Sequence, residues 1–99
     1  MILNVGAATV TASAATETTI GTEIAAVTSA VAAVITGVMP MGADVDSIAF
    51  AAALNTAGAS YIGAASEHVA NRTLFADAQS IAAATYTATD VISNASLAL

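Results

Sequence analysis

Residues 38–46 read Val38-Met39-Pro40-Met41-Gly42-Ala43-Asp44-Val45-Asp46 and contain the only proline of the 99-residue chain. Proline lacks a backbone N–H and disfavours the α region for the residue before it, so a helix arriving from the N-terminal side is expected to end here. Gly42 allows the chain to reverse direction. Asp44 is a good N-cap, and Asp46 adds negative charge at the positive end of a following helix. The stretch therefore predicts a helix, a turn and a second helix.

Before the turn, large apolar residues recur at steps of three and four, which is the spacing of one stripe along an α-helix. We expect a first helix over residues 7–37 and a turn over residues 38–44. Glu17 and Glu23 lie off the stripe and are expected to face water. The stripe consists of Ile20, Ile24, Val27, Val31, Val34, Ile35 and Val38.

After the turn, two seven-residue series lie side by side on a helix predicted over residues 45–88, with a flexible C-terminal tail beyond it. One series is Leu54, Tyr61, His68, Phe75 and Ala82. The other is Ile48, Asn55, Ile62, Val69, Ala76 and Ala83. Together they make an apolar surface wider than one neighbouring helix covers. We therefore expect these series to contact a partner chain through Ile48, Leu54, Tyr61, Ile62, His68, Val69 and Phe75.

The expected fold is a single all-α domain over residues 1–99, in which two long antiparallel helices complete a four-helix bundle with a partner chain. Composition supports the need for a partner, because 58% of the residues are hydrophobic and 8% are charged, far from the usual soluble balance. Much of the apolar content is alanine, which buries little area per residue. A membrane or a partner must cover the excess. The net charge of -6 repels nucleic-acid phosphates and anionic lipid surfaces, so we expect no binding to nucleic acid.

A membrane-inserting hairpin, such as a small holin-like or pore-forming chain, is the alternative from a different class. Residues 24–43 form a twenty-residue window without a charge. Hydroxyl residues, two glycines and a proline interrupt that window, and no Lys or Arg flanks it to set an orientation. The N-terminus lacks the positive segment and compact apolar core of a cleaved signal peptide.

Motifs that carry chemistry are absent from the sequence. There is no cysteine, and the single histidine, His68, lies in an apolar series. Its neighbour Glu67 points about 100° away around a helix, so the two cannot act together on one substrate. Asp44 and Asp46 lack the further acids and spaced glycine of a calcium loop. We expect no enzyme, no cofactor and no metal site.

Near the C-terminus, Tyr86-Thr87-Ala88-Thr89-Asp90 places an aromatic residue and an acid four residues apart, on one face of a helix. An acid in the last turn of a helix opposes the helix dipole by about 0.3–1 kcal/mol, so stability gives no reason for it there. A signal that another protein reads is one alternative reason.

These features together resemble the PE proteins of mycobacteria. The resemblance rests on the length, the alanine-rich composition, the turn Val38-Met39-Pro40 followed by Ala43-Asp44, the aromatic Phe75 and the terminal Tyr86-x-x-x-Asp90. It covers essentially the whole chain. There is one departure, because Ala7-Ala8 stands where PE proteins have Pro-Glu at the start of the first helix, which predicts a looser N-terminus.

The resemblance implies a function as well as a fold. A PE protein pairs lengthwise with a PPE protein in a four-helix bundle, and an EspG-type chaperone holds the PPE subunit before export. The pair Tyr86 and Asp90 resembles the signal that the type VII secretion machinery reads. On this reading, the heterodimer moves from the cytoplasm to the cell envelope or the medium.

Overall fold

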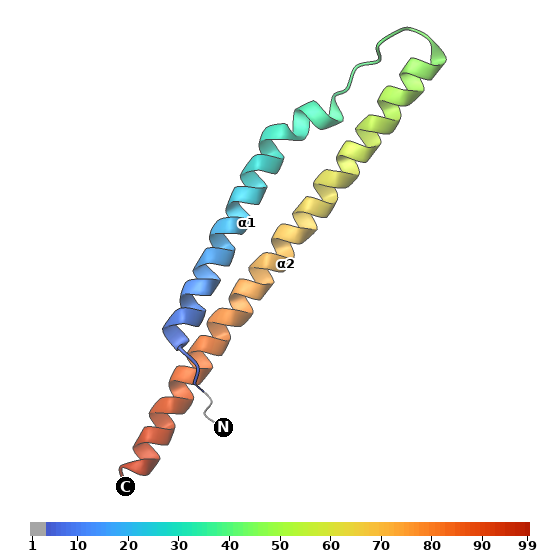
Figure 1. The fold of residues 1–99 in the computed structure, drawn as a ribbon. Coiled ribbons are helices and arrows are strands. Elements are labelled where there is room, and N and C mark those ends of the chain that lie inside the picture. Colours follow the sequence, from blue (N-terminus) through green and yellow to red (C-terminus); the bar gives the residue numbers. More distant parts are fainter. Residues whose placement is uncertain (1–3) are drawn as a thin grey trace. The chain divides into compact units, whose positions relative to one another are not determined.

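The computed structural model describes residues 4–99, and over that range it consists of two α-helices and no β-strand. Helix α1 covers Ala7–Thr36 and helix α2 covers Val45–Leu97 (Figure 1). The two helices form a hairpin, which confirms the predicted all-α fold of two long helices. The completion of a four-helix bundle by a partner stays a prediction.

The helix boundaries differ from the expected ones mainly at the C-terminal end. Helix α1 begins at residue 7 and ends one residue earlier than expected, and α2 begins at residue 45. The expected end of the second helix at residue 88 is wrong, because α2 continues to Leu97. Residues 89–97 contain no glycine or proline, and Thr, Val, Ser and Asn each cost less than about 0.7 kcal/mol in a helix. The segment expected to be a tail is therefore helical, and Asp90 lies about two turns before the helix end.

Threonine and serine side chains are accommodated within both helices by local hydrogen bonds. The hydroxyls of Thr11, Thr16 and Thr19 each donate to the carbonyl oxygen four residues earlier, at distances of 3.0–3.1 Å. Thr56 and Thr85 do the same in α2. Such bonds satisfy the hydroxyl without competing for the helical N–H groups. The hydroxyl-rich start of α1 is consequently helical from Ala7 onward.

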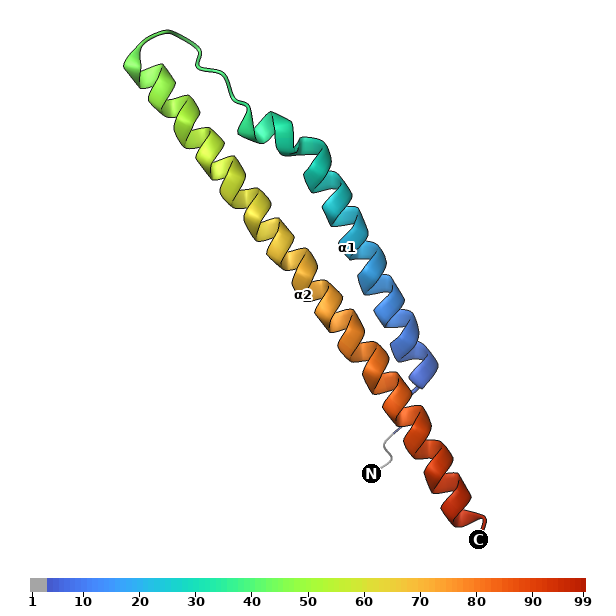
Figure 2. The ribbon, with the colours of Figure 1, turned by 180° about the vertical axis from the view of Figure 1, so that it is seen from behind.

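The contacts of the chain divide it into two compact units, each containing a segment of α1 beside a segment of α2. The turn unit is Gly21–Ala70, and it includes the turn between the helices. The end unit combines the residues up to Ile20 with Asn71–Leu99. Figure 2 shows from behind how α1 leads through the turn into α2 within the turn unit.

In the turn unit, the seam between the two helix segments combines small residues with isoleucine, valine and one asparagine. On α2 the least exposed residues recur at alternating steps of four and three, the spacing of helices that pack lengthwise. They are Ala51, Asn55, Gly58, Ile62, Ala65 and Val69. On α1 the corresponding residues are Gly21, Ile24, Thr28, Ala32 and Ile35. A Cβ added at Gly58 would overlap the carbonyl oxygen of Ile35, so the two backbones meet there at the closest approach that glycine permits.

In the end unit, the seam is small and partly polar. Ala14 of α1 and Ala76 and Ala83 of α2 are buried. Between them, the Glu17 carboxylate forms an ion pair with the Arg72 guanidinium, and both side chains are about three-quarters buried. The expectation that Glu17 faces water is therefore wrong. Four residues separate it from Ser13, which places both on the side of α1 that meets α2.

The hairpin buries little apolar surface for its size. Within residues 4–99, the buried apolar residues are Ala14, Ala51, Ala76 and Ala83, and no large side chain is fully buried.

Candidate partner interface

The turn is held to the second helix at two points. Asp44 caps α2 as predicted: the Ser47 N–H donates to Asp44 Oδ2 at 2.9 Å, and the Ser47 hydroxyl donates to Oδ1 at 2.8 Å. These bonds, the one from the backbone N–H first, lower the pKa of the Asp44 carboxyl below its ordinary value of 3.8. The cap fixes where the second helix begins and therefore where its side chains point.

Asn55 provides the second attachment. Its Oδ1 accepts the Val38 N–H at 2.7 Å, and its Nδ2 donates to the Val38 carbonyl oxygen at 3.1 Å. One side chain thus satisfies both backbone groups of Val38, which lies two residues after the end of α1. Without Asn55, these groups would lack helical partners. Sequence analysis placed Asn55 in an apolar series without assigning it this role. The available signal was an amide at a seam position about three turns of helix after the capped start at Asp44.

A third polar contact lies in the end unit, beside the Glu17–Arg72 ion pair. Gln79 Nε2 donates to Ser13 Oγ at 2.9 Å. The other amide atom, Gln79 Oε1, is buried and accepts no hydrogen bond within the described part of the chain. A shift of one helical turn between the two segments would separate both the Glu17–Arg72 pair and the Ser13–Gln79 pair. These contacts therefore favour one register of the two helix segments.

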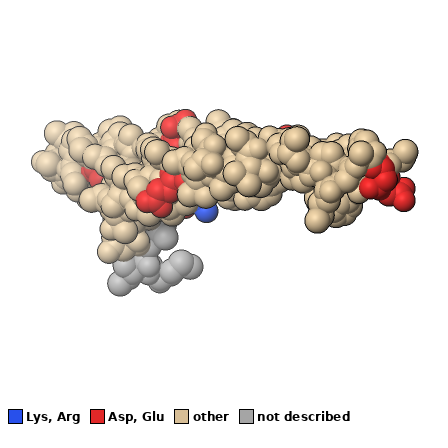
Figure 3. All heavy atoms as spheres, turned by 90° about the horizontal axis from the view of Figure 1, so that it is seen from above, with Lys and Arg blue, Asp and Glu red and all other residues tan. Residues whose placement is uncertain are grey.

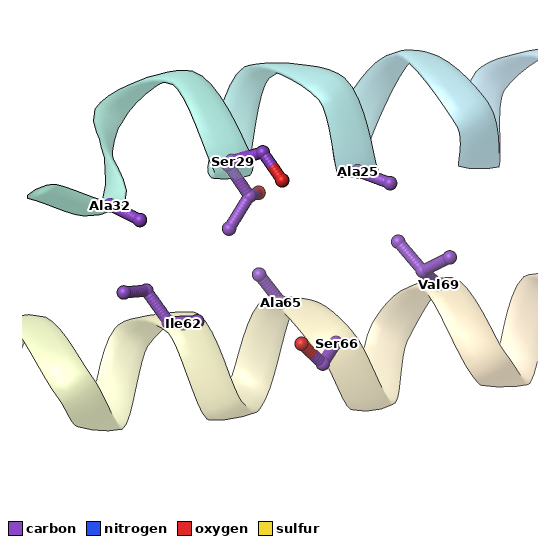
Figure 4. Close-up of a pocket in the computed structure, with 8 residues that line it drawn as sticks. Ala25, Ser29, Ala32, Ile62, Ala65, Ser66 and Val69 are labelled. Atoms are coloured by element: carbon purple, nitrogen blue, oxygen red, sulfur yellow. The ribbon is translucent and has the colours of Figure 1, made fainter.

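The seven predicted interface residues fall into two groups. Ile62 and Val69 belong to the seam of the turn unit and line a cavity of about 270 Å³ together with Ala25, Ser29 and Ala32 of α1 (Figure 4). Figure 4 shows Ile62 and Val69 on α2 directed toward α1. They therefore contact their own hairpin, and contact with a partner stays a prediction for them.

The other five predicted interface residues are exposed. Tyr61 is 59% exposed, Phe75 53% and Ile48 52%, while Leu54 is 39% exposed and His68 also lies at the surface. Leu54, Tyr61, His68 and Phe75 are the seven-residue series immediately next to the seam. Exposed apolar side chains of this kind usually mark a contact with another molecule, and contact with a partner stays a prediction for these five residues.

The turn unit has a groove on this exposed side. Val31 and Val34 of α1 and Leu54 and Tyr61 of α2 line it, and its volume is about 620 Å³. We call it the valine–tyrosine groove, and its full lining is Val31, Val34, Ile35, Val38, Leu54, Ala57, Gly58 and Tyr61. The opposite cavity of Figure 4 is lined mainly by alanine and serine. Large apolar side chains thus gather on one side of the hairpin in this unit.

The predicted signal residues Tyr86 and Asp90 both lie on α2 in the end unit, four residues apart, and both are exposed. Tyr86 is 44% exposed. Residues at this spacing share a helix face, so a second protein can contact the phenol and the carboxylate together. Their role as a signal stays a prediction.

Charge is sparse on the surface. On the face shown in Figure 3, most of the surface carries neither acidic nor basic side chains, and the acids form small separate groups. The single cation of the sequence, Arg72, is paired with Glu17. Residues 4–99 hold no group of three or more acids or histidines arranged to bind a metal ion.

Both helices are long and apolar enough to cross a membrane by length and composition. Ala7–Thr36 has a mean hydropathy of 1.5 in its most apolar window, and Val45–Leu97 has 1.3. Only 6% of each window is buried within the hairpin. One or two such helices are weak evidence for a membrane span, because partner-covered helices and signal sequences share these properties.

Comparison with known proteins gives one match. The family described as the PE family matches residues 3–93, which is most of the chain. No curated protein and no solved structure is similar enough to count as a match.

Proposed function

The chain belongs to the PE family, and from this premise we propose that it is the PE subunit of a heterodimer with a PPE protein, exported by a type VII secretion system to the cell envelope or the medium. The observation that carries the proposal is the unequal distribution of side-chain size. Small residues alternate with Asn55, Ile62 and Val69 along the seam of α2, while Val34, Leu54 and Tyr61 remain exposed. A hairpin of this kind gains most of its apolar burial from a second protein.

The valine–tyrosine groove is the surface that supports this pairing best. It is apolar, it lies between two helix segments, and helices of a partner fit such grooves lengthwise. Val34 is 73% exposed and Tyr61 is 59% exposed, so each has considerable area left to bury. At about 25 cal/mol per Å² of apolar surface, each such side chain contributes on the order of 1 kcal/mol.

Export is the second part of the proposal, and Tyr86 and Asp90 are its candidate signal. They lie on one helix face, three and seven residues beyond the last buried seam residue, Ala83, and both are exposed. An EspG-type chaperone would reach this chain indirectly, through the PPE subunit. The proposal places the protein in the cytoplasm before export.

A membrane-inserting hairpin is the second candidate function, favoured by the length and hydropathy of both helices. The acids Glu17, Glu23 and Glu67 and the ion-paired Arg72 all lie within these helices. Each charge at the centre of a bilayer costs at least about 2.5 kcal/mol, which counts against spanning.

Co-expression separates the two functions. We expect the chain to be insoluble alone and to become soluble, with a stable 1:1 complex, when produced with a PPE protein that is its partner. Tyr61→Asp should abolish the complex, because it places a charge in an apolar interface. Leu74→Asp is the matched control, since Leu74 is 66% exposed on α2 outside the groove. A chain that enters the membrane fraction with or without the PPE protein would instead support the membrane-inserting hairpin.

A further inference from the structure

A second apolar pocket lies at the turn, and neither the family's secretion signal nor the helix seam accounts for it. Met39, Pro40, Met41 and Phe50 line it, and its volume is about 340 Å³. We call it the turn pocket. Met41 is 99% exposed, Met39 80% and Phe50 65%. Three large apolar side chains exposed around one cavity form a small hydrophobic patch, which usually marks a contact with another molecule.

The turn pocket is held in place by hydrogen bonds on both sides. The Asn55 side chain bonds both backbone groups of Val38, immediately before Met39. Asp44 caps the helix that carries Phe50. Because the loop is fixed at both ends, ordering it costs little further entropy when a ligand binds. Methionine side chains adapt readily to the shape of what they contact.

The charges around the turn pocket restrict what can occupy it. The Asp46 side chain lines the pocket, and Asp44 lies two residues before it. These carboxylates repel an anionic lipid surface. A second copy of the chain would bring the same two acids, and its single cation, Arg72, is paired with Glu17 in the end unit. The occupant with complementary chemistry is therefore a protein segment with an apolar side chain next to a Lys or Arg.

The turn pocket is continuous with the valine–tyrosine groove. Leu54 and Val38 line both cavities, so a protein that covers the groove reaches the turn pocket without a gap. We propose that the turn pocket is part of the partner interface: it receives an apolar side chain of the PPE subunit, with a Lys or Arg of that subunit beside Asp46. This inference rests on the proposed heterodimer and adds the chemistry that the partner must present at the turn.

Subunit exchange tests the proposal on the purified heterodimer. The complex is mixed with an excess of isotope-labelled wild-type complex, and native mass spectrometry follows the loss of the unlabelled chain. Phe50→Ser should accelerate dissociation at least about tenfold, as expected for losing the burial of one large side chain. Leu74→Ser is the control for an equally exposed residue of α2, and it should exchange at the wild-type rate. Equal rates for the two variants would overturn the proposal.

A charge variant tests the predicted cation. Asp46→Asn should accelerate exchange several-fold at low salt and less at high salt, because salt screens an exposed ion pair. Asp77→Asn, at another exposed acid of α2, should change the rate less than twofold. Identical behaviour of the two variants at both salt concentrations would remove the cation from the proposal.

The same samples distinguish other occupants. A 2:2 complex that Phe50→Ser converts into a 1:1 complex would assign the turn pocket to a second copy. If the heterodimer floats with phosphatidylcholine vesicles and the Phe50→Ser variant does not, the turn pocket binds a lipid surface. Either result overturns the proposal for the turn pocket while leaving the heterodimer intact, whereas failure of the wild-type chains to associate rejects the heterodimer itself.

Discussion

Gly58 offers the sharpest test of the helix seam, because the structure predicts opposite effects for the same substitution at two glycines of α2. An added Cβ at Gly58 would overlap the carbonyl oxygen of Ile35 and lie 2.8 Å from its carbonyl carbon. At Gly63, nothing lies within 4 Å of an added Cβ. Both glycines lie within the same helix and the same unit. The backbone preference for alanine in a helix is therefore equal at both sites, and the contacts alone differ.

The magnitude follows from two opposing terms. Replacing glycine by alanine inside a helix stabilises it by about 1 kcal/mol. At Gly63 this gain stands alone. At Gly58 the new methyl group meets backbone, which cannot rotate away, so the helices must separate, and overpacking of this kind costs about 1–3 kcal/mol. We expect Gly63→Ala to stabilise by about 1 kcal/mol and Gly58→Ala to be neutral or destabilising by up to about 2 kcal/mol.

Thermal unfolding of the purified heterodimer, followed by circular dichroism, measures the difference. For a complex of about 150–250 residues, 1 kcal/mol corresponds to a shift of about 2–4 °C in Tm. Gly63→Ala should raise Tm, and Gly58→Ala should leave it unchanged or lower it. Equal increases for both variants would refute the close approach of the two helices at Gly58.

Three further predictions concern the turn and the C-terminal half of α2. Asn55→Ala should destabilise by about 1–3 kcal/mol, because it removes both bonds to the turn backbone, whereas Asn71→Ala, at an exposed position, should leave Tm unchanged. Because the pKa of Asp44 is lower in the folded protein than its ordinary value of 3.8, the ionised Asp44 carboxylate stabilises the fold fully above pH 3.8. This contribution to stability is lost as the pH falls through the pKa of the folded protein. Asp44→Asn should therefore remove this part of the pH dependence of Tm. Tyr86→Ala and Asp90→Ala should leave a soluble heterodimer in the cytosol but abolish its export, measured as secreted against cytosolic protein, while Asp90→Glu should still be exported. Normal export of both alanine variants would reject the signal.

Local rules predicted the turn well. Helix α1 ends at Thr36, four residues before Pro40, and α2 begins directly after Asp44, because the chemistry that decides these boundaries lies within a few residues. The end of α2 was harder to predict. No glycine or proline follows residue 88, and hydroxyl residues such as Thr89, Ser93 and Ser96 only weaken a helix.

The assignment of faces could not be settled from the two apolar series alone. Both series are apolar and lie next to each other on α2, so the large residues alone do not indicate which series packs against α1. The small residues Ala51, Gly58 and Ala65 carry that information, because they complete a four-and-three spacing with Asn55, Ile62 and Val69. Glu17 was misplaced for a related reason, since its partner Arg72 lies 55 residues away in the sequence.

The division between a small seam and a large outer face has an energetic consequence. Close approach at Gly58 and at the buried alanines brings the helices together but removes little apolar surface from water. The cost of ordering more than eighty helical residues is about 1–2 kcal/mol per residue for the backbone alone. The larger side chains that could offset it, Val34, Leu54, Tyr61 and Phe50, remain exposed in the hairpin. A partner that covers that face would therefore contribute directly to folding, which would link folding of the hairpin thermodynamically to assembly of the complex.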